Sequence, residues 1–293
     1  MSAFAFFGAI ELGLVYAFVA LGVFLSFRIL NFPDLTVDGS FPLGAAVAAV
    51  LLIAGWNPWL ATAIACVAGA IAGFVTAFVS VRFQILHLLA SILTMIALFS
   101  VNLRIMGRPN VAVLNRETLI TPFYQFGLQP YLVRPLLVLL LAAAGAGLMA
   151  LFLRTDLGLA LRATGANPRM ARAQGIHIGA QIIAGVALSN ALVALAGALF
   201  AQTNGFADVT SGVGTIVVGL AAVIVGETLL PRGGMFVAVV ACVLGSVLYR
   251  LAVQLALSLD FLGLTPSDLN LATAVLVLVT LIVPRFRQRK ATA

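Results

Sequence analysis

The chain has 293 residues, of which 63% are hydrophobic and 9% are charged, and its formal net charge is +7. A soluble domain of this length would carry about a quarter of its residues as Asp, Glu, Lys and Arg, so the composition excludes a soluble globular protein and indicates a surface that mostly faces lipid. The basic residues lie in short clusters between apolar segments, a pattern that indicates membrane orientation and argues against nucleic-acid binding.

Apolar segments long enough to cross a bilayer follow one another from the N-terminus. With roughly 20 apolar residues per crossing, they predict helices near residues 5–27, 41–55, 58–80, 85–106, 134–153, 178–201, 212–230, 234–257 and 268–284. All should be helical, because backbone groups cannot stay unpaired in lipid and no alternating barrel pattern is present. We expect an all-α, polytopic bundle of about nine spans, within a range of eight to ten, forming one domain over residues 1–293.

An irregular stretch, FPDLTVDGSFPLGA at residues 32–45, interrupts the chain at the second predicted span. Pro33 and Pro42 bracket the stretch, and a proline disfavours helical conformation in the residue before it. The backbone is therefore predicted to be unwound over residues 31–40.

The same stretch places two carboxylates, Asp34 and Asp38, between long apolar segments. A charged side chain at the bilayer centre costs about 2.5 to 3.5 kcal/mol, so both must face water, a cavity or polar partners. One interpretation is an irregular segment at membrane depth that lines a cavity. The other is a cytoplasmic hairpin just beyond Arg28, in which Asp34 or Asp38 caps the next helix.

Basic clusters indicate how the predicted helices are oriented. The segment TDLGLALRATGANPRMARAQGIH at residues 155–177 and the tail RFRQRK at 285–290 are both rich in arginine. The positive-inside rule places both in the cytoplasm, and the even number of predicted helices between them agrees with this. The proline-bearing segment 107–133 is then predicted to lie outside.

The pattern within residues 155–177 predicts a short helix that is too short to cross a membrane. Asn167 can cap the helix, Pro168 suits its first position, and Gly175 suits the left-handed residue that ends it. About seven residues lie between these signals, roughly 10 Å of helix.

The residues of this short helix favour contact with another protein. Arg169 and Arg172 share one face, and Met170 lies in a small, compact surface beside them. The alternative is a solvated loop that its arginines hold near anionic lipid.

Four stretches carry a family resemblance: LRATGANPRMARAQGI at residues 161–176, LGLVYAFVALGVFLSFRILNFPDLTVDGSFPLGA at 12–45, GIHIGAQIIAGVALSNALVALAGAL at 175–199 and GLAAVIVGETLL at 219–230. In their order and spacing, the chain resembles the permeases of ATP-binding-cassette importers of the branched-chain amino acid and ribose uptake type. It closely resembles a subgroup described as uncharacterised or aromatic amino acid (tryptophan or tyrosine) uptake permeases. The resemblance covers nearly the whole chain.

The resemblance implies a membrane-spanning permease subunit that forms the translocation path for a small solute, with an amino acid as a candidate. It implies three partners: a cytoplasmic ATPase, an extracytoplasmic solute-binding protein and a second copy of this chain. The implied location is the cytoplasmic (inner) membrane of a bacterium, with the C-terminus in the cytoplasm.

Nucleotide chemistry is expected on another polypeptide. The chain contains no G-x-x-x-x-G-K-[ST] loop, and its one lysine is Lys290, so ATP and Mg²⁺ should bind to the partner ATPase. No Ser-His-Asp, paired-carboxylate or metal-ligand arrangement is recognisable in the sequence. We expect no catalytic residue, metal or cofactor in this chain and no enzymatic activity of its own.

In importers of this type, a cytoplasmic segment fits into a groove of the ATPase, and the resemblance assigns that role to residues 155–177. The candidate coupling residues are Arg162, Gly165, Asn167, Pro168, Arg169, Met170, Arg172 and Gly175.

An internal similarity suggests where a solute would pass. DLTVDGSFPLGAAVAA, from residue 34, and DVTSGVGTIVVGLAA, from residue 208, share Asp-x-Thr followed by a glycine-bearing apolar segment. Interrupted segments at matching places in two halves indicate a path at a repeat interface. The candidate path residues are Asp34, Thr36, Asp38, Asp208 and Thr210.

Two further expectations concern charged residues. A proton-coupled secondary transporter is the alternative function, with Asp34, Asp38 or Glu11 as proton sites. Glu227 lies near Arg232 in the sequence, which predicts an ion pair or a cap.

Overall fold

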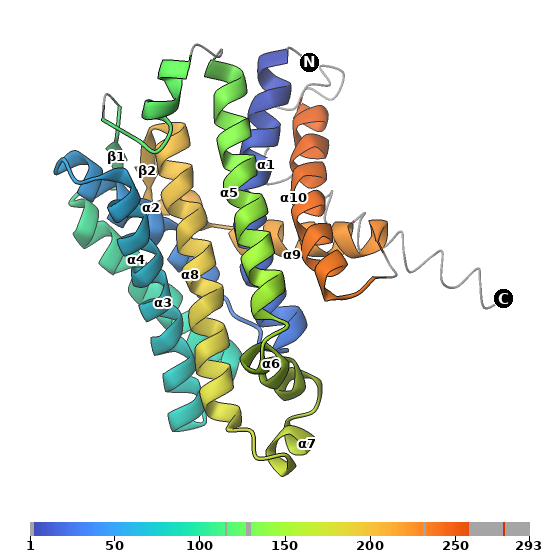
Figure 1. Cartoon of the computed structure of the whole chain (residues 1–293). Helices are drawn as coiled ribbons and strands as arrows, with labels where there is room; N and C mark the ends of the chain where they lie inside the picture. The colour runs from blue at the N-terminus through green and yellow to red at the C-terminus, as the bar shows by residue number, and fades with distance from the viewer. Residues whose placement is uncertain (1–2, 115, 127–129, 231–232, 258–277, 279–293) are drawn as a thin grey trace.

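The computed structural model describes residues 3–114, 116–126, 130–230, 233–257 and 278 of the chain as a bundle of helices (Figure 1). The α-helices are α1 (Ala3–Val23), α2 (Val37–Ile53), α3 (Pro58–Phe83), α4 (His87–Met106), α5 (Pro130–Phe152), α6 (Asp156–Ala166), α7 (Pro168–Ala173), α8 (Ile178–Asn204), α9 (Thr215–Leu229) and α10 (Met235–Leu257). A π-helix, η1 (Phe24–Ile29), continues α1, and the 3-10 helices are η2 (Thr121–Phe126) and η3 (Val209–Gly212). Two short strands, β1 (Asn110–Ala112) and β2 (Phe206–Asp208), pair antiparallel.

The bundle has two distinct ends (Figure 1). One end carries α6 and α7, and we call it the α7 end. The opposite end carries the paired strands β1 and β2 and the start of α1, and we call it the sheet end. The strand pair was not predicted, because its register of Asn110 opposite Asp208 joins segments that are far apart in the sequence.

Helix length and composition confirm a bundle of apolar spans. Within the described residues, seven helices are long and apolar enough to cross a membrane, and α2 is a shorter apolar helix. These eight match the first eight predicted segments. The ninth, 268–284, lies outside the described residues, so the total of about nine stays a prediction.

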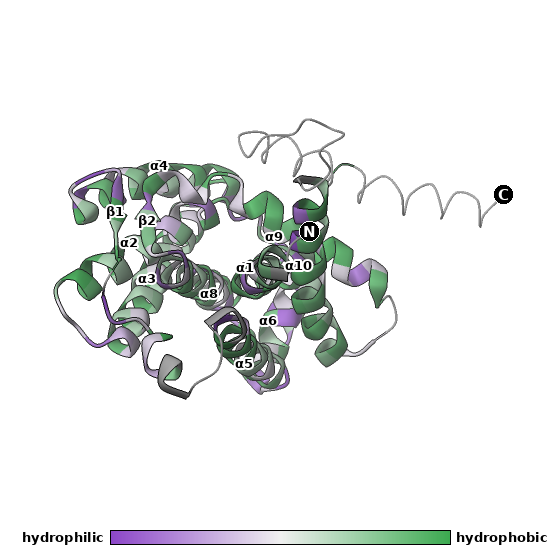
Figure 2. Cartoon of the chain, turned by 90° about the horizontal axis from the view of Figure 1, so that it is seen from above, coloured by the Kyte–Doolittle hydropathy of each residue, from purple (hydrophilic) through white to green (hydrophobic). Residues whose placement is uncertain are grey.

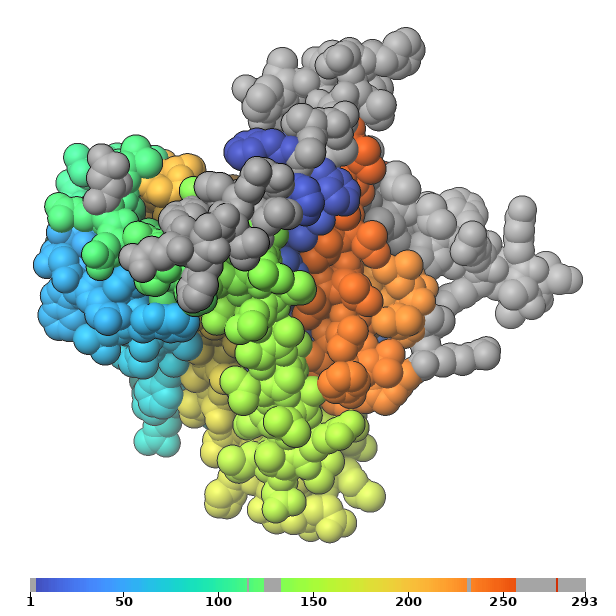
Figure 3. Space-filling model, turned by 45° about the horizontal axis from the view of Figure 1, so that its top comes forward, coloured from blue at the N-terminus to red at the C-terminus, as the bar shows by residue number. Residues whose placement is uncertain are grey.

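Helices α1 and α8 form the middle of the bundle, as the view along the bundle shows (Figure 2). In the most apolar 18-residue windows, 78% of the α1 window and 61% of the α8 window are buried, against 22% for α4. The outer helices expose apolar side chains instead. In the space-filling view α5 forms a surface strip that leads to α6 and α7 (Figure 3), and its exposed residues include Leu136, Leu140 and Leu148.

Helices α2 and α8 cross with their backbones in direct contact. A Cβ atom at Gly44 would fall on the carbonyl oxygen of Ala194, and one at Gly197 would fall on the carbonyl oxygen of Phe41. Small residues permit such close approach of helices in membranes.

We expect Gly197→Ala to lower the free energy of unfolding by about 1 to 3 kcal/mol, because the added methyl group overpacks the crossing. Gly147→Ala is the matched control, since a Cβ there would meet no atom within 4 Å. Thermal unfolding of both variants in detergent micelles checks this. Equal stability of the two variants would contradict the described crossing.

The chain is unwound between η1 and α2, though over a shorter stretch than predicted. Asn31 has a left-handed φ of 55°, and α2 begins at Val37 with Thr36 as its N-cap. The unwound stretch is therefore residues 31–36, which we call the break, and the prediction that it extends to Ser40 is wrong. Pro42 lies inside α2, and Gly212 of η3, which has no side chain, lies against its ring and against the carbonyl oxygen of Asp38.

Candidate functional site

A buried polar cluster surrounds the break. Asp34 is fully buried, its Oδ1 accepts the Thr36 N–H at 2.9 Å, and its Oδ2 accepts the Asn190 side-chain amide at 2.6 Å. Ser40 donates to Asn190 Oδ1 at 2.7 Å, and the hydroxyls of Thr36 and Thr76 are 2.9 Å apart. All five side chains are buried, and the carboxylate is satisfied by the Thr36 N–H of the break and by the Asn190 amide of α8.

Asp38 makes a different, long-range contact. Its Oδ1 accepts the N–H of Ile216 at 2.8 Å, and its Oδ2 accepts the N–H of Gly214 at 3.2 Å. These amides open α9, so the carboxylate caps that helix and lies at the positive end of its dipole. Asp38 therefore caps a helix, as one interpretation of the sequence predicted. The prediction that it caps the next helix in the sequence is wrong. The capped helix begins far along the chain at Thr215, because the fold brings its N-terminus beside α2.

The two Asp-x-Thr stretches adopt the same turn. The N–H of Thr36 donates to Asp34 at 2.9 Å, and the N–H of Thr210 donates to Asp208 at 2.7 Å. The stretches also touch at matching positions, because Gly212, four residues after the second Asp, lies against the Asp38 carbonyl oxygen. The contact agrees with the internal similarity of the sequence.

The two turns differ in how deeply they are buried. The Asp34 turn is buried, whereas Asp208 is half-buried and Thr210 is exposed. Burial opposes ionisation of Asp208, but hydrogen bonds from the Thr210 side chain, from Asn110 and from the Thr210 N–H hold the pKa of its carboxyl below the ordinary value. The candidate path residues thus lie in three places. Asp34 and Thr36 form a buried group, Asp38 contacts the start of α9, and Asp208 and Thr210 form a separate turn at the sheet end.

The predicted short helix is present as α7. Asn167 caps it by accepting the Met170 N–H at 3.1 Å, Pro168 takes the first position, and Gly175 has a left-handed φ of 82°. Ala171 is buried and anchors the helix. The prediction of this helix is confirmed.

The outer face of α7 is available to a partner. Met170 has an exposed fraction of 62%, and Arg169 and Arg172 are exposed on either side of it in the sequence. The helix lies at the extremity of the bundle, beyond the last turns of the long helices (Figure 1).

The other two coupling candidates belong to α6, a helix that we did not predict. Thr155 caps it by accepting the Gly158 N–H at 3.3 Å, and Asp156 stands in its first turn. A threonine followed directly by an acidic residue is a local signal of a helix start, and this pair could have revealed α6. Arg162 is half-buried in α6, and Gly165 packs against η1.

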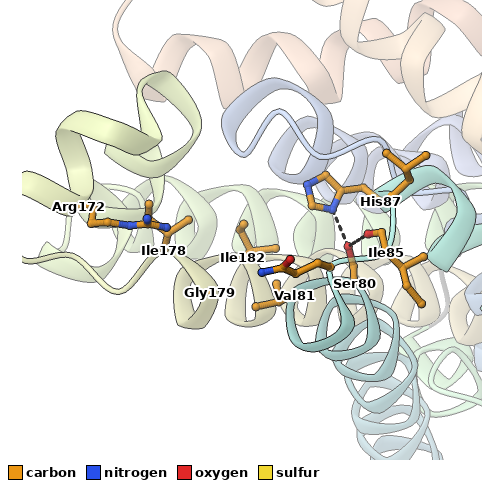
Figure 4. A pocket seen from close by; sticks show the side chains of 10 residues that line it. Ser80, Val81, Ile85, His87, Arg172, Ile178, Gly179 and Ile182 are labelled. Atoms are coloured by element: carbon orange, nitrogen blue, oxygen red, sulfur yellow. Dashed lines mark hydrogen bonds between the residues drawn. The ribbon is translucent and has the colours of Figure 1, made fainter.

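A pocket of about 390 Å³ lies beside α7, between the α3–α4 turn and the start of α8 (Figure 4). Arg172 lines one side and His87 another, with Ile178 and Ile182 between them.

The pocket also contacts the break through His87, whose ring centroid lies 4.3 Å from that of Phe32. Ser80 donates to the Ile85 carbonyl at 2.9 Å and lies 2.6 Å from His87 Nδ1, which assigns the proton to Nδ1 and leaves Nε2 as an acceptor.

Some functional contacts were missed or assigned to other partners. Glu227 pairs with Arg28 of η1 at 2.6 Å, whereas Arg232, its predicted neighbour, lies outside the described residues. Asn190 was not singled out, although an asparagine within an apolar helix is itself a signal of buried hydrogen bonding. The searched part of the chain contains no group of three or more His, Cys, Asp or Glu side chains that could hold a metal.

Comparisons with known proteins place this chain among transport permeases. Residues 5–284 match the family described as the permease component of branched-chain amino acid transport systems. The tyrosine transport system permease protein of Clostridioides difficile (strain R20291) is 36% identical over 268 residues, which are 92% of this chain and 87% of that protein. An uncharacterised protein of Rickettsia prowazekii (strain Madrid E) is 36% identical over 184 residues, 63% of each chain. PsaBC from Streptococcus pneumoniae in complex with Fab has the same fold, with a TM-score of 0.56 and 16% identity over 96% of this chain and 91% of that chain.

Proposed function

This chain belongs to the family of permease components of branched-chain amino acid transport systems, and we propose on this basis that it is the membrane-spanning subunit of an ATP-driven importer. It is a multi-pass membrane protein and a transport permease subunit. The proposal adds the energy source, the partners and the solute. The chain forms the passage, and ATP and Mg²⁺ bind to a separate ATPase.

The observation that carries the proposal is the shape of the α7 end. A short helix, capped at Asn167 and ended at Gly175, presents Met170 between two arginines. A methionine left exposed with flanking cations suits an apolar groove with acidic edges on another protein. We assign that groove to the ATPase.

Orientation follows from the same end of the molecule. The positive-inside rule places the α7 end in the cytoplasm, because six arginines lie in or next to the helix ends there: Arg28, Arg82, Arg154, Arg162, Arg169 and Arg172. The C-terminal residues 285–290, also basic, belong on the same side. The sheet end then faces the solute-binding protein outside the cytoplasmic membrane of a bacterium.

The translocation path passes the break. Asp34 and Thr36 lie there, Asp38 follows in the first turn of α2, and the matching turn of Asp208 and Thr210 lies nearer the sheet end. In this conformation the Asp34 cluster is closed, because all its side chains are buried. ATP binding to the partner opens and closes this region by moving α7, and two copies of the chain frame the path.

The solute is an amino acid, and tyrosine is the first to test. The C. difficile relative that covers 92% of this chain is named a tyrosine transport permease. The external binding protein makes most of the selection, so the chain itself supplies a passage with few specific contacts.

We expect Met170→Asp to reduce the ATPase that co-purifies with the chain by at least about tenfold, because a buried methionine contributes about 1.5 to 3 kcal/mol to an interface. The tagged chain is purified from its own cells in mild detergent, and vanadate-sensitive ATP hydrolysis is measured. The bound polypeptide, identified by mass spectrometry, should carry a G-x-x-x-x-G-K-[ST] loop.

Met170→Leu is the matched control, since it keeps an apolar side chain of similar size, and its hydrolysis should stay within about twofold of the unmodified chain. Equal recovery of the ATPase with Met170→Asp would show that α7 is not the docking element.

A further inference from the structure

The end of α6 lies directly on the end of η1, backbone against backbone. A Cβ atom at Gly165 would coincide with the carbonyl oxygen of Ile29 and would crowd the Cα atom of Leu30. No side chain separates the two elements at this point, which we call the Gly165 contact. Because close-packed interiors deform little, a displacement of α6 here must move η1 as well.

Helix α6 is in turn tied closely to α7. Asn167 ends the first helix and begins the second: its N–H donates to the Ala163 carbonyl at 3.0 Å, and its side chain accepts the Met170 N–H at 3.1 Å. Its own carbonyl accepts the Ala171 N–H at 3.0 Å. One residue that is hydrogen-bonded to both helices joins them, so we expect them to move as a unit.

On the other side of the Gly165 contact, η1 holds the break. The N–H of Phe32, within the break, donates to the Ser26 carbonyl of η1 at 2.8 Å. The Leu30 side chain fits into the space left by Gly185 of α8. Segments of π-helix are frequent at functional sites, and here one connects α1 to an unwound stretch.

The two elements that flank the break, η1 and α2, both contact α9. Arg28 of η1 pairs with Glu227 near the C-terminal end of α9, and Asp38 of α2 caps the N-terminal end. A shift of η1 and the break therefore acts on both ends of α9.

We propose that the Gly165 contact transmits movement of the α6–α7 unit to the break. This inference rests on the proposed function, in which the ATPase binds α7. Gly165 is a positioning residue: it acts through η1 and touches neither solute nor nucleotide. Among the eight candidate coupling residues, it is the one whose replacement should separate ATP hydrolysis from movement in the membrane.

The test follows the break without needing the transported solute. Leu35, half-buried in the break, is replaced by cysteine in a background with Cys66→Ser and Cys242→Ala. The rate of N-ethylmaleimide labelling is compared between nucleotide-free and vanadate-trapped complexes of the chain with its ATPase. The parent should show a change of roughly threefold or more, the size that couplings of this kind produce.

Gly165→Ala should abolish that nucleotide-dependent change while ATP hydrolysis stays within about twofold of the parent, because docking through α7 is intact but α6 can no longer seat on η1. Ala163→Val is the matched control: it adds bulk to an exposed position of the same helix and should behave as the parent. Leu30→Ala should uncouple the complex like Gly165→Ala, because it removes the side chain that fits against Gly185 of α8 and so loosens the backbone next to the Gly165 contact.

Three results would overturn the inference. In the first, Gly165→Ala keeps the labelling change of the parent, and in the second it loses ATP hydrolysis and the labelling change in equal proportion. In the third, neither Gly165→Ala nor Leu30→Ala assembles with the ATPase. The last would show a purely structural role. Absence of any recruited ATPase activity in the parent complex would instead refute the proposed function, so the two failures are distinguishable.

Discussion

Asp34→Ala is expected to lower the free energy of unfolding by about 3 kcal/mol or more, because it leaves two buried donors, the Thr36 N–H and the Asn190 amide, without an acceptor. Denaturation in detergent micelles, followed by tryptophan fluorescence, measures the loss. The matched control is Asp208→Ala, which breaks the same kind of turn at a half-buried position and should cost under about 1 kcal/mol.

The Asn variant at the same position separates structure from charge. Asp34→Asn keeps an oxygen for the Thr36 N–H, so it should retain more stability than Asp34→Ala. Similar, small losses for Asp34→Ala and Asp208→Ala would show that the buried cluster does not hold the break.

Asp38→Ala is expected to release the start of α9. The amides of Gly214 and Ile216 lose their acceptor, and hydrogen exchange in the first turn of α9 should quicken by roughly tenfold to a hundredfold, equivalent to about 1 to 3 kcal/mol. Exchange followed by mass spectrometry over residues 209–220 measures this.

Transport should also decrease in Asp38→Ala, because Asp38 joins α2, which follows the break directly, to α9. Thr210→Val is the control for hydrogen exchange: it removes a hydroxyl from the neighbouring exposed turn and leaves the Asp38 contact intact. Unchanged exchange in Asp38→Ala would mean that the carboxylate is not what orders the start of α9.

The parts of this structure that could be predicted from the sequence are those with local signals. Helix α7 follows from Asn167, Pro168 and Gly175, because each fixes the backbone of its own neighbourhood. The long helices follow from apolar segments of sufficient length, because lipid requires paired backbone groups. In the same way, the break follows from Pro33 and the charges around it.

The parts that were missed depend on contacts between distant segments. The carboxylate of Asp38 could be recognised as a cap, but its choice of α9 depends on how the helices assemble. The close packing of Gly212 against α2 beside Pro42 likewise has no local signal in the sequence. The partner of Glu227 is Arg28, which no local pattern indicates. Sequence patterns thus found the carboxylates of the site but neither Asn190 nor the pairing of these groups.

Reconstituted uptake tests the central claim most directly. The chain is inserted into proteoliposomes with its ATPase and its solute-binding protein, and uptake of tyrosine and other aromatic amino acids is measured with ATP supplied on the α7 side. The account predicts uptake that requires ATP and the ATPase and is unaffected by a proton ionophore. Uptake by the chain alone, driven by a proton gradient and abolished in Asp34→Asn, would contradict it and establish a proton-coupled carrier instead.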